Sequence, residues 1–157
     1  MRIIAMRGAA NHGKTTAIRK AYDAFSKSAS VVSHKINNNG EDFEAVVKTA
    51  GGKTVGFFSQ GDCGWDEEHN IDTAEKAGCD VLVTAVRTSG ETMNAVGEYC
   101  VNAKDHEVLL VGVIDMWTHS NPASRIYDNI NGNRFSAISD LVAKHLLNVL
   151  EYVLRVI

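Results

Sequence analysis

The chain has 157 residues, of which 45% are apolar and 22% charged, a composition typical of one globular domain with a substantial core. Its formal net charge of −3 argues against non-specific binding to nucleic acids or acidic membranes, because that binding requires a basic surface. No apolar run approaches the roughly 18 residues of a transmembrane helix. Since the first expected strand leaves no room for a signal peptide, we expect a cytoplasmic protein.

The N-terminal elements follow a strand–loop–helix order. The apolar run Arg2–Met6 predicts a buried strand, and the glycine-containing segment Gly8–Thr15 follows it directly. A helix is then indicated by apolar residues that share one helical face. They are Ala17, Ile18, Ala21, Tyr22 and Phe25.

The next segments predict a strand followed by a β-hairpin. Ser30–His34 is a short strand candidate, and the polar stretch Asn37–Asp42 predicts an exposed loop. Two strand-like runs, Ala45–Thr49 and Lys53–Phe58, flank the turn Ala50–Gly52. This spacing is typical of an antiparallel hairpin.

The second half of the chain alternates helices with strongly apolar strands. A helix is expected from about Asp66 to Ala77, and Ser89 is the N-cap candidate for another. The runs Asp80–Val86 and Val108–Ile114 are continuous enough for strands buried on both faces. The wide apolar stripe of Phe135–Ile157 predicts a long helix packed across the sheet, or alternatively a helix that forms a homo-oligomer or binds a protein partner.

These elements together predict an α/β protein with a single domain spanning residues 1–157. The expected architecture is a three-layer α/β/α sandwich. Its sheet is expected to be mostly parallel, with one antiparallel strand from the hairpin.

The most specific motif in the chain is the segment Gly8–Thr15, which matches the phosphate-binding P-loop pattern G-x-x-x-x-G-K-[ST]. The glycines let successive backbone N–H groups point at one anion, and the helix N-terminus faces the same phosphates. Lys14 is expected to lie between the β- and γ-phosphates, and the Thr15 hydroxyl to ligate Mg²⁺. The nucleotide-binding residues predicted from this motif are Gly8, Ala9, Ala10, Asn11, His12, Gly13, Lys14, Thr15 and Thr16.

A second acid is needed for Mg²⁺, held at the end of a strand next to the P-loop. Ser59 occupies such a strand end but is not acidic, and Asp62 is the nearest carboxylate after it. We therefore predict Asp62 as a direct or water-mediated partner of the metal. The alternative is that Asp62 serves the turn formed with Gly61 and Gly64.

The loop Gly8–Thr16 resembles the G-H-V-D-H-G-K-T-T loop of the translational GTPases, and an antiparallel hairpin after the first helix is also a feature of Ras-like GTPase domains. Asp62-Cys63-Gly64 is similar to D-C-P-G with one residue missing. Asp115 matches the aspartate of N-K-x-D, which reads guanine, whereas Gly112 and Val113 replace its asparagine and lysine. The resemblance implies a P-loop NTPase that uses Mg²⁺. Because the asparagine and lysine that accompany the guanine-reading aspartate are replaced, ATP is favoured over GTP as the nucleotide.

Other polar residues are candidates for catalysis. Arg87 follows the strongest strand and is expected to face the ligand crevice, where it would stabilise charge on the transferred phosphate. Arg125 and Arg134 lie in or beside a polar loop that is either a lid over the phosphates or a solvated surface segment. Gln60 is a weaker candidate for orienting water.

The cysteines support no strong metal or disulfide prediction. Cys63, Cys79 and Cys100 are odd in number and widely spaced, which favours free thiols in a reducing compartment. A zinc site that uses Cys63 with His69 is the alternative.

Three functions are compatible with this pattern. The first is Mg²⁺-dependent hydrolysis of a nucleoside triphosphate, with Lys14, Asp62 and Arg87 as catalytic groups. The second is a kinase that transfers the γ-phosphate to a nucleotide or another small acceptor. The third is a non-catalytic nucleotide-binding module that signals to a protein partner.

Overall fold

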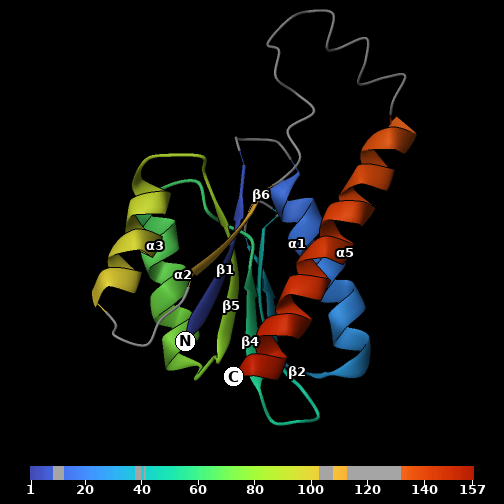
Figure 1. Cartoon of the computed structure of the whole chain (residues 1–157), viewed down its shortest axis with the longest axis horizontal. Helices are drawn as coiled ribbons and strands as arrows, with labels where there is room; N and C mark the ends of the chain where they lie inside the picture. The colour runs from blue at the N-terminus through green and yellow to red at the C-terminus, as the bar shows by residue number, and fades with distance from the viewer. Residues whose placement is uncertain (9–12, 38–39, 41, 103–107, 113–131) are drawn as a thin grey trace, which may run out of the picture.

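The structure of the chain is a computed structural model that describes residues 1–8, 13–37, 40, 42–102, 108–112 and 132–157 (Figure 1). The helices and strands follow the order expected from the sequence, so the α/β class is confirmed. In chain order they are β1 (Arg2–Arg7), α1 (Lys14–Phe25), the short 3₁₀ helix η1 (Ser26–Ser28), β2 (Ser30–Ile36), β3 (Phe43–Lys48), β4 (Thr54–Phe58), α2 (Gly64–Lys76), β5 (Val81–Val86), α3 (Glu91–Asn102), β6 (Val108–Gly112) and α5 (Gly132–Val156).

The strands form one six-stranded sheet in the order β2-β3-β4-β5-β1-β6. Strands β4, β5, β1 and β6 run parallel to one another, whereas β3 is antiparallel to both of its neighbours, β2 and β4. The sheet is therefore mixed, and the expectation of a mostly parallel sheet is corrected. The reason is connection length, because the short segments that join β2 to β3 and β3 to β4 cannot cross over the sheet as a parallel connection must.

Helices cover the sheet on both of its faces (Figure 1). Helices α1 and α5 lie on one face, and α2 and α3 lie on the other. Alternate side chains of strand β1 pack on opposite faces of the sheet. Ile4 and Met6 pack into the core beneath α1 and α5, while Ile3 and Ala5 pack into the core on the other face. This alternation explains why the central strands are apolar at consecutive positions.

Helix α5 buries its apolar stripe against the α1 side of the sheet. Val142, Leu146, Leu150 and Val153 belong to the same core cluster as residues of α1 and the strands, so the expected packing of this helix across the sheet is confirmed. Leu141 and Tyr152 remain exposed on its outer surface. In the part of the chain that the structure describes, no helix has the length and apolarity needed to cross a membrane.

Two helix starts differ from the sequence prediction. Helix α2 begins at Gly64, and Asp66 closes a capping box with Cys63. Helix α3 begins at Glu91, and the Asn94 N–H donates to the Gly90 carbonyl, so the predicted N-cap at Ser89 is wrong by one residue. Gly90 has a φ of 93°, a conformation that glycine adopts without strain.

Candidate functional site

The predicted site residues come from loops at one edge of the sheet. Strands β1, β4 and β5 run parallel, so their carboxyl ends meet at that edge. Gly8 to Thr15 follow β1, Asp62 follows β4, and Arg87 follows β5. The fold therefore brings together three segments that are far apart in the sequence.

The beginning of α1 shows why a glycine stands at position 13. Gly13 is the N-cap of the helix with a φ of 78°, in the left-handed region that a side chain disfavours. Its carbonyl accepts the first helical hydrogen bond, from the Ala17 N–H at 2.9 Å. Thr16 lies in the first turn of α1. Four predicted phosphate-binding residues lie outside the described part of the chain: Ala9, Ala10, Asn11 and His12.

Lys14 is enclosed at this edge, with 8% of the residue exposed. Its Nζ donates to the Gly8 carbonyl at 2.9 Å, across the two ends of the loop. Burial lowers the pKa of Lys14 from its ordinary value, and the charge of Arg87 lowers it further, against the opposing effect of Asp62 and Asp42. Because the Arg87 charge lies near the buried Lys14 ammonium, an anion bound here would stabilise the charged form of Lys14.

Beside Lys14, three oxygen-bearing side chains meet. The Thr15 hydroxyl donates to Asp42 Oδ1 at 3.1 Å, and the Ser59 hydroxyl donates to the same oxygen at 3.0 Å. Ser59 is held by β3, since the Phe43 N–H donates to its hydroxyl at 3.0 Å. Hydroxyl and carboxylate oxygens of this kind are ligands that Mg²⁺ prefers, so Thr15 and Asp42 fit a magnesium site.

Sequence reasoning missed Asp42, because it treated the segment 37–42 only as an exposed polar loop. The available signal was the hairpin itself. An antiparallel β3 must begin at the edge where β4 ends, so a carboxylate just before β3 lies near Ser59. The strand that ends at Ser59 is separated from β1 by β5, which lies between β4 and β1.

Asp62 and Arg87 form an ion pair rather than standing alone. Arg87 Nη2 donates to Asp62 Oδ1 at 2.9 Å, and the Asp62 side chain is 73% exposed. The loop after β5 is positioned from both sides. Arg7 Nη2 donates to the Thr88 carbonyl at 2.6 Å, and the Arg87 N–H donates to Thr92 Oγ1 at 2.9 Å. Arg87 is therefore held beside Asp62, and its charge acts on Lys14.

Asp66 organises the loop that carries Asp62. Its Oδ2 accepts hydrogen bonds from the backbone N–H groups of Asp62 and Cys63, and from the Cys63 thiol at 3.2 Å. Its Oδ1 accepts one from Gln60 Nε2 at 2.9 Å. Gln60 Oε1 in turn accepts from the Asn37 amide. The Gln60 side chain, considered above as a water-orienting group, is engaged on both of its polar atoms.

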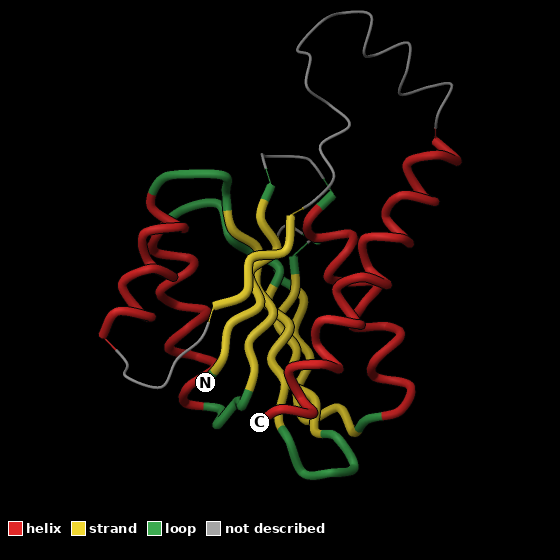
Figure 2. Tube along the Cα trace, viewed as in Figure 1, coloured by secondary structure: helices red, strands yellow, loops and turns green. Residues whose placement is uncertain are grey.

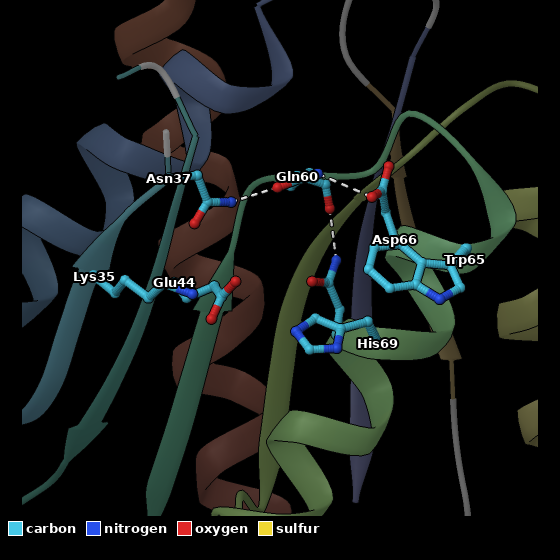
Figure 3. Close-up of a pocket in the computed structure, with 8 residues that line it drawn as sticks. Lys35, Asn37, Glu44, Gln60, Trp65, Asp66 and His69 are labelled. Carbon is cyan, nitrogen blue, oxygen red and sulfur yellow. Dashed lines mark hydrogen bonds between the residues drawn. The ribbon is translucent and has the colours of Figure 1, made fainter. Parts of the chain in front are cut away.

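A pocket of about 340 Å³ lies beside this network (Figure 3). Lys35 and Glu44 line it from strands β2 and β3. Trp65 and His69 line it from α2, with the two rings stacked at a centroid distance of 5.6 Å. Within the described residues there is no group of three or more His, Cys, Asp or Glu placed to hold a metal ion.

Beneath the same loop, Glu67 is completely buried, with 0% exposed. Its Oε2 accepts hydrogen bonds from Thr84 at 2.9 Å and from Asn70 at 3.4 Å, while Oε1 has no partner among the described residues. Burial raises the pKa of Glu67 to about 8. The side chain is therefore mostly a neutral acid at neutral pH.

The pKa of Glu67 predicts a distinctive pH dependence. Because the folded pKa of about 8 exceeds the unfolded value near 4.5, the folded state binds the extra proton between these values. The free energy of unfolding should then fall as the pH rises from 4.5 to 8, by at most about 1.4 kcal/mol per pH unit. Urea unfolding of the wild type and of Glu67→Gln at pH 5 to 9 isolates this contribution. We expect Glu67→Gln to gain stability relative to the wild type over that range, whereas parallel pH profiles would contradict the assignment.

Several predicted residues carry no described side-chain geometry. Asp115 and Arg125 lie outside the described residues, and Arg134 lies in the first turns of α5, where only the backbone is described.

Comparison with known proteins places the chain in no characterised group. No protein-family model matches it. No curated protein matches it, and neither does any solved structure. The assignment of function therefore depends on the site itself.

Proposed function

We propose that the protein binds nucleoside triphosphates, with ATP favoured over GTP, and hydrolyses them in a Mg²⁺-dependent reaction. The observation that carries this proposal is the contact between the Thr15 hydroxyl and the Asp42 carboxylate, one residue from the buried Lys14. A magnesium-bound triphosphate needs oxygen ligands for the metal and a cation for the phosphates. The hydroxyl and the carboxylate supply the oxygens, and the enclosed ammonium supplies the cation.

In this proposal each residue has a defined task. Lys14 releases the Gly8 carbonyl and binds the oxygens between the β- and γ-phosphates. Thr15 and Asp42 would hold Mg²⁺, either directly or through its water ligands. The backbone N–H groups at the start of α1 face the phosphates, where the helix dipole favours negative charge.

The hydrolytic step uses water as the nucleophile. The water oxygen forms a bond to the γ-phosphorus while the bond from that phosphorus to the β,γ-bridging oxygen breaks, and the nucleoside diphosphate leaves with the electron pair. The protons of the water end on the released phosphate and in bulk solvent. Arg87 lies close enough to act on Lys14 electrostatically, so its guanidinium is suited to stabilise charge on the transferred group. Asp62 holds Arg87 in this position.

The proposal includes a P-loop NTPase fold of three layers. It is supported by the helices on both faces of the sheet, which Figure 2 shows as two red layers on either side of the yellow strands. It is also supported by the position of the segment 8–13 between a central strand and the start of a helix.

A pair of variants tests the metal site. Asp42→Asn should weaken the apparent affinity for Mg²⁺ in ATP binding by about tenfold or more, because a charged ligand becomes neutral. Asp62→Asn should have a smaller effect, through loss of the ion pair with Arg87. The measurement is a calorimetric titration of ATP at a series of magnesium concentrations. An unchanged magnesium dependence in Asp42→Asn would remove Asp42 from the site, and a larger effect of Asp62→Asn would return the metal to Asp62.

A second candidate function, phosphoryl transfer to a small acceptor, is favoured by one observation. The pocket lined by Gln60 and Trp65 adjoins the loop that carries Asp62, and a kinase needs an acceptor pocket that hydrolysis does not. Labelled ATP incubated with candidate acceptors distinguishes the two, since hydrolysis releases label only as free phosphate.

A further inference from the structure

The pocket between α2 and the β2–β3 hairpin has features of a ligand site (Figure 3). Its volume of about 340 Å³ falls in the range of small-molecule sites, which is about 300–1,000 Å³. All of its lining residues are in the described part of the chain. The aromatic, amide and charged side chains that line it come from separate elements.

The amide groups of the pocket have fixed orientations. The backbone N–H groups of Asp62 and Cys63 hold Asp66, which accepts from Gln60 Nε2. This leaves Gln60 Oε1 to accept from Asn37 Nδ2. Asn37 Oδ1 is then a buried acceptor without a partner among the described residues. An unsatisfied buried acceptor is costly, so a donor on a bound molecule would be favourable there.

Two of the charged side chains that line the pocket have no partner among the described residues. Lys35 and Glu44 are cross-strand neighbours on β2 and β3. Neither side chain has a hydrogen bond or ion pair among the described residues. The pocket therefore offers a cationic donor, an anionic acceptor and a neutral acceptor together.

Trp65 provides an aromatic surface at the pocket. The residue is 69% exposed, although it is a large apolar side chain. His69 stacks on it with an interplanar angle of 12°, which supports the indole on one side. An indole at the border of a polar pocket is suited to stack against a planar ring.

The position of the pocket relates it to the phosphate site. Ser59 and Gln60 are consecutive, but the Ser59 hydroxyl donates to Asp42 while the Gln60 amide donates to Asp66. The pocket thus begins one residue after Ser59, whose hydroxyl contacts the proposed magnesium ligand Asp42. A triphosphate whose metal was held by Asp42 and Thr15 would therefore lie next to this pocket.

We propose that this pocket binds a second small molecule, a nucleoside, beside the terminal phosphate of the bound triphosphate. A nucleobase combines a planar face for Trp65 with an edge of adjacent donors and acceptors for Asn37 and Glu44. The location next to the phosphate rests on the proposed function, whereas the binding of the nucleoside does not.

The test uses free nucleosides, which carry no phosphate for Lys14 to hold. Adenosine, guanosine, cytidine and thymidine are titrated by calorimetry into the wild type, with ribose as the compound that lacks a base. We expect at least one nucleoside to bind and ribose to fail. Trp65→Leu and Asn37→Ala should each weaken that binding about tenfold or more. The matched control is Tyr152→Leu, which removes an exposed aromatic side chain from α5 and should leave the affinity unchanged.

Two further titrations separate this proposal from the NTPase proposal. Lys14→Ala should bind the nucleoside with wild-type affinity even though its ATP binding is lost. A non-hydrolysable ATP analogue with Mg²⁺ should bind together with the nucleoside. Competition between the two would show that the pocket holds the base of the triphosphate itself, which would overturn the inference. The inference would also be overturned if none of the four nucleosides bound, or if Trp65→Leu bound the nucleoside as tightly as the wild type does. The affinity of the wild type for ATP decides the NTPase proposal separately.

Discussion

Replacing Lys14 with alanine is expected to weaken the binding of Mg·ATP by about 100-fold or more, because truncating one partner of a buried charge pair leaves the phosphate charge uncompensated. Lys14 is an enclosed cation at the start of α1, and its ammonium donates to the Gly8 carbonyl at 2.9 Å. Calorimetry with ATP and Mg²⁺ measures the change in affinity directly.

Lys20→Ala is the matched control for this experiment. Lys20 lies on the same helix but forms an ion pair with Asp140 of α5 at 2.7 Å, away from the loop. Such an exposed pair contributes about 0–1 kcal/mol to stability, so this variant should fold and bind ATP as the wild type does. Undiminished binding by Lys14→Ala, with normal thermal unfolding, would remove the lysine from the site.

The central strands could be predicted from the sequence because a strand that is buried on both faces of a sheet is a continuous run of apolar residues. Strand β5, with Val81 to Val86 all buried, lies in the interior of the sheet between β4 and β1. The glycine at position 13 could also be predicted, since the motif requires a left-handed residue where the loop enters α1. In both cases the physical cause is local in the chain.

The order of the strands could not be predicted in the same way. The placement of β5 between β4 and β1 depends on which apolar faces pack best against helices of the whole domain. No residue near the P-loop encodes that choice.

Asp42 and the pocket were missed for a related reason. The partners of Asp42, Thr15 and Ser59, are 27 and 17 positions away along the chain. The pocket likewise depends on a hydrogen-bond chain from Asn37 through Gln60 to Asp66. Polar residues in loops have little sequence pattern, and only the pairing of the hairpin with β4 brings these groups together.

Gly61→Ala is expected to lower the free energy of unfolding by about 1–3 kcal/mol or more, as overpacking does, and to impair nucleotide binding. A Cβ at position 61 would lie 1.8 Å from the carbonyl oxygen of Ala85. That oxygen belongs to the backbone of the central strand β5, which pairs with β1 through Met6 and cannot retreat. The loop must therefore move away, and it carries Ser59 and Asp62 on either side of the substitution.

Gly97→Ala is the matched control, since it makes the same chemical change in α3. A Cβ there meets no atom within 4 Å, and alanine should stabilise the helix by roughly 1 kcal/mol relative to glycine. Urea unfolding should show a lower free energy of unfolding for Gly61→Ala and a higher one for Gly97→Ala, although both variants replace glycine with alanine. ATP titrations of the same two variants measure nucleotide binding. If Gly61→Ala instead unfolds at the same urea concentration as the wild type and binds ATP normally, the loop does not rest on β5. The contacts of Ser59 and Asp62 would then lose the support that their role at the phosphate site requires.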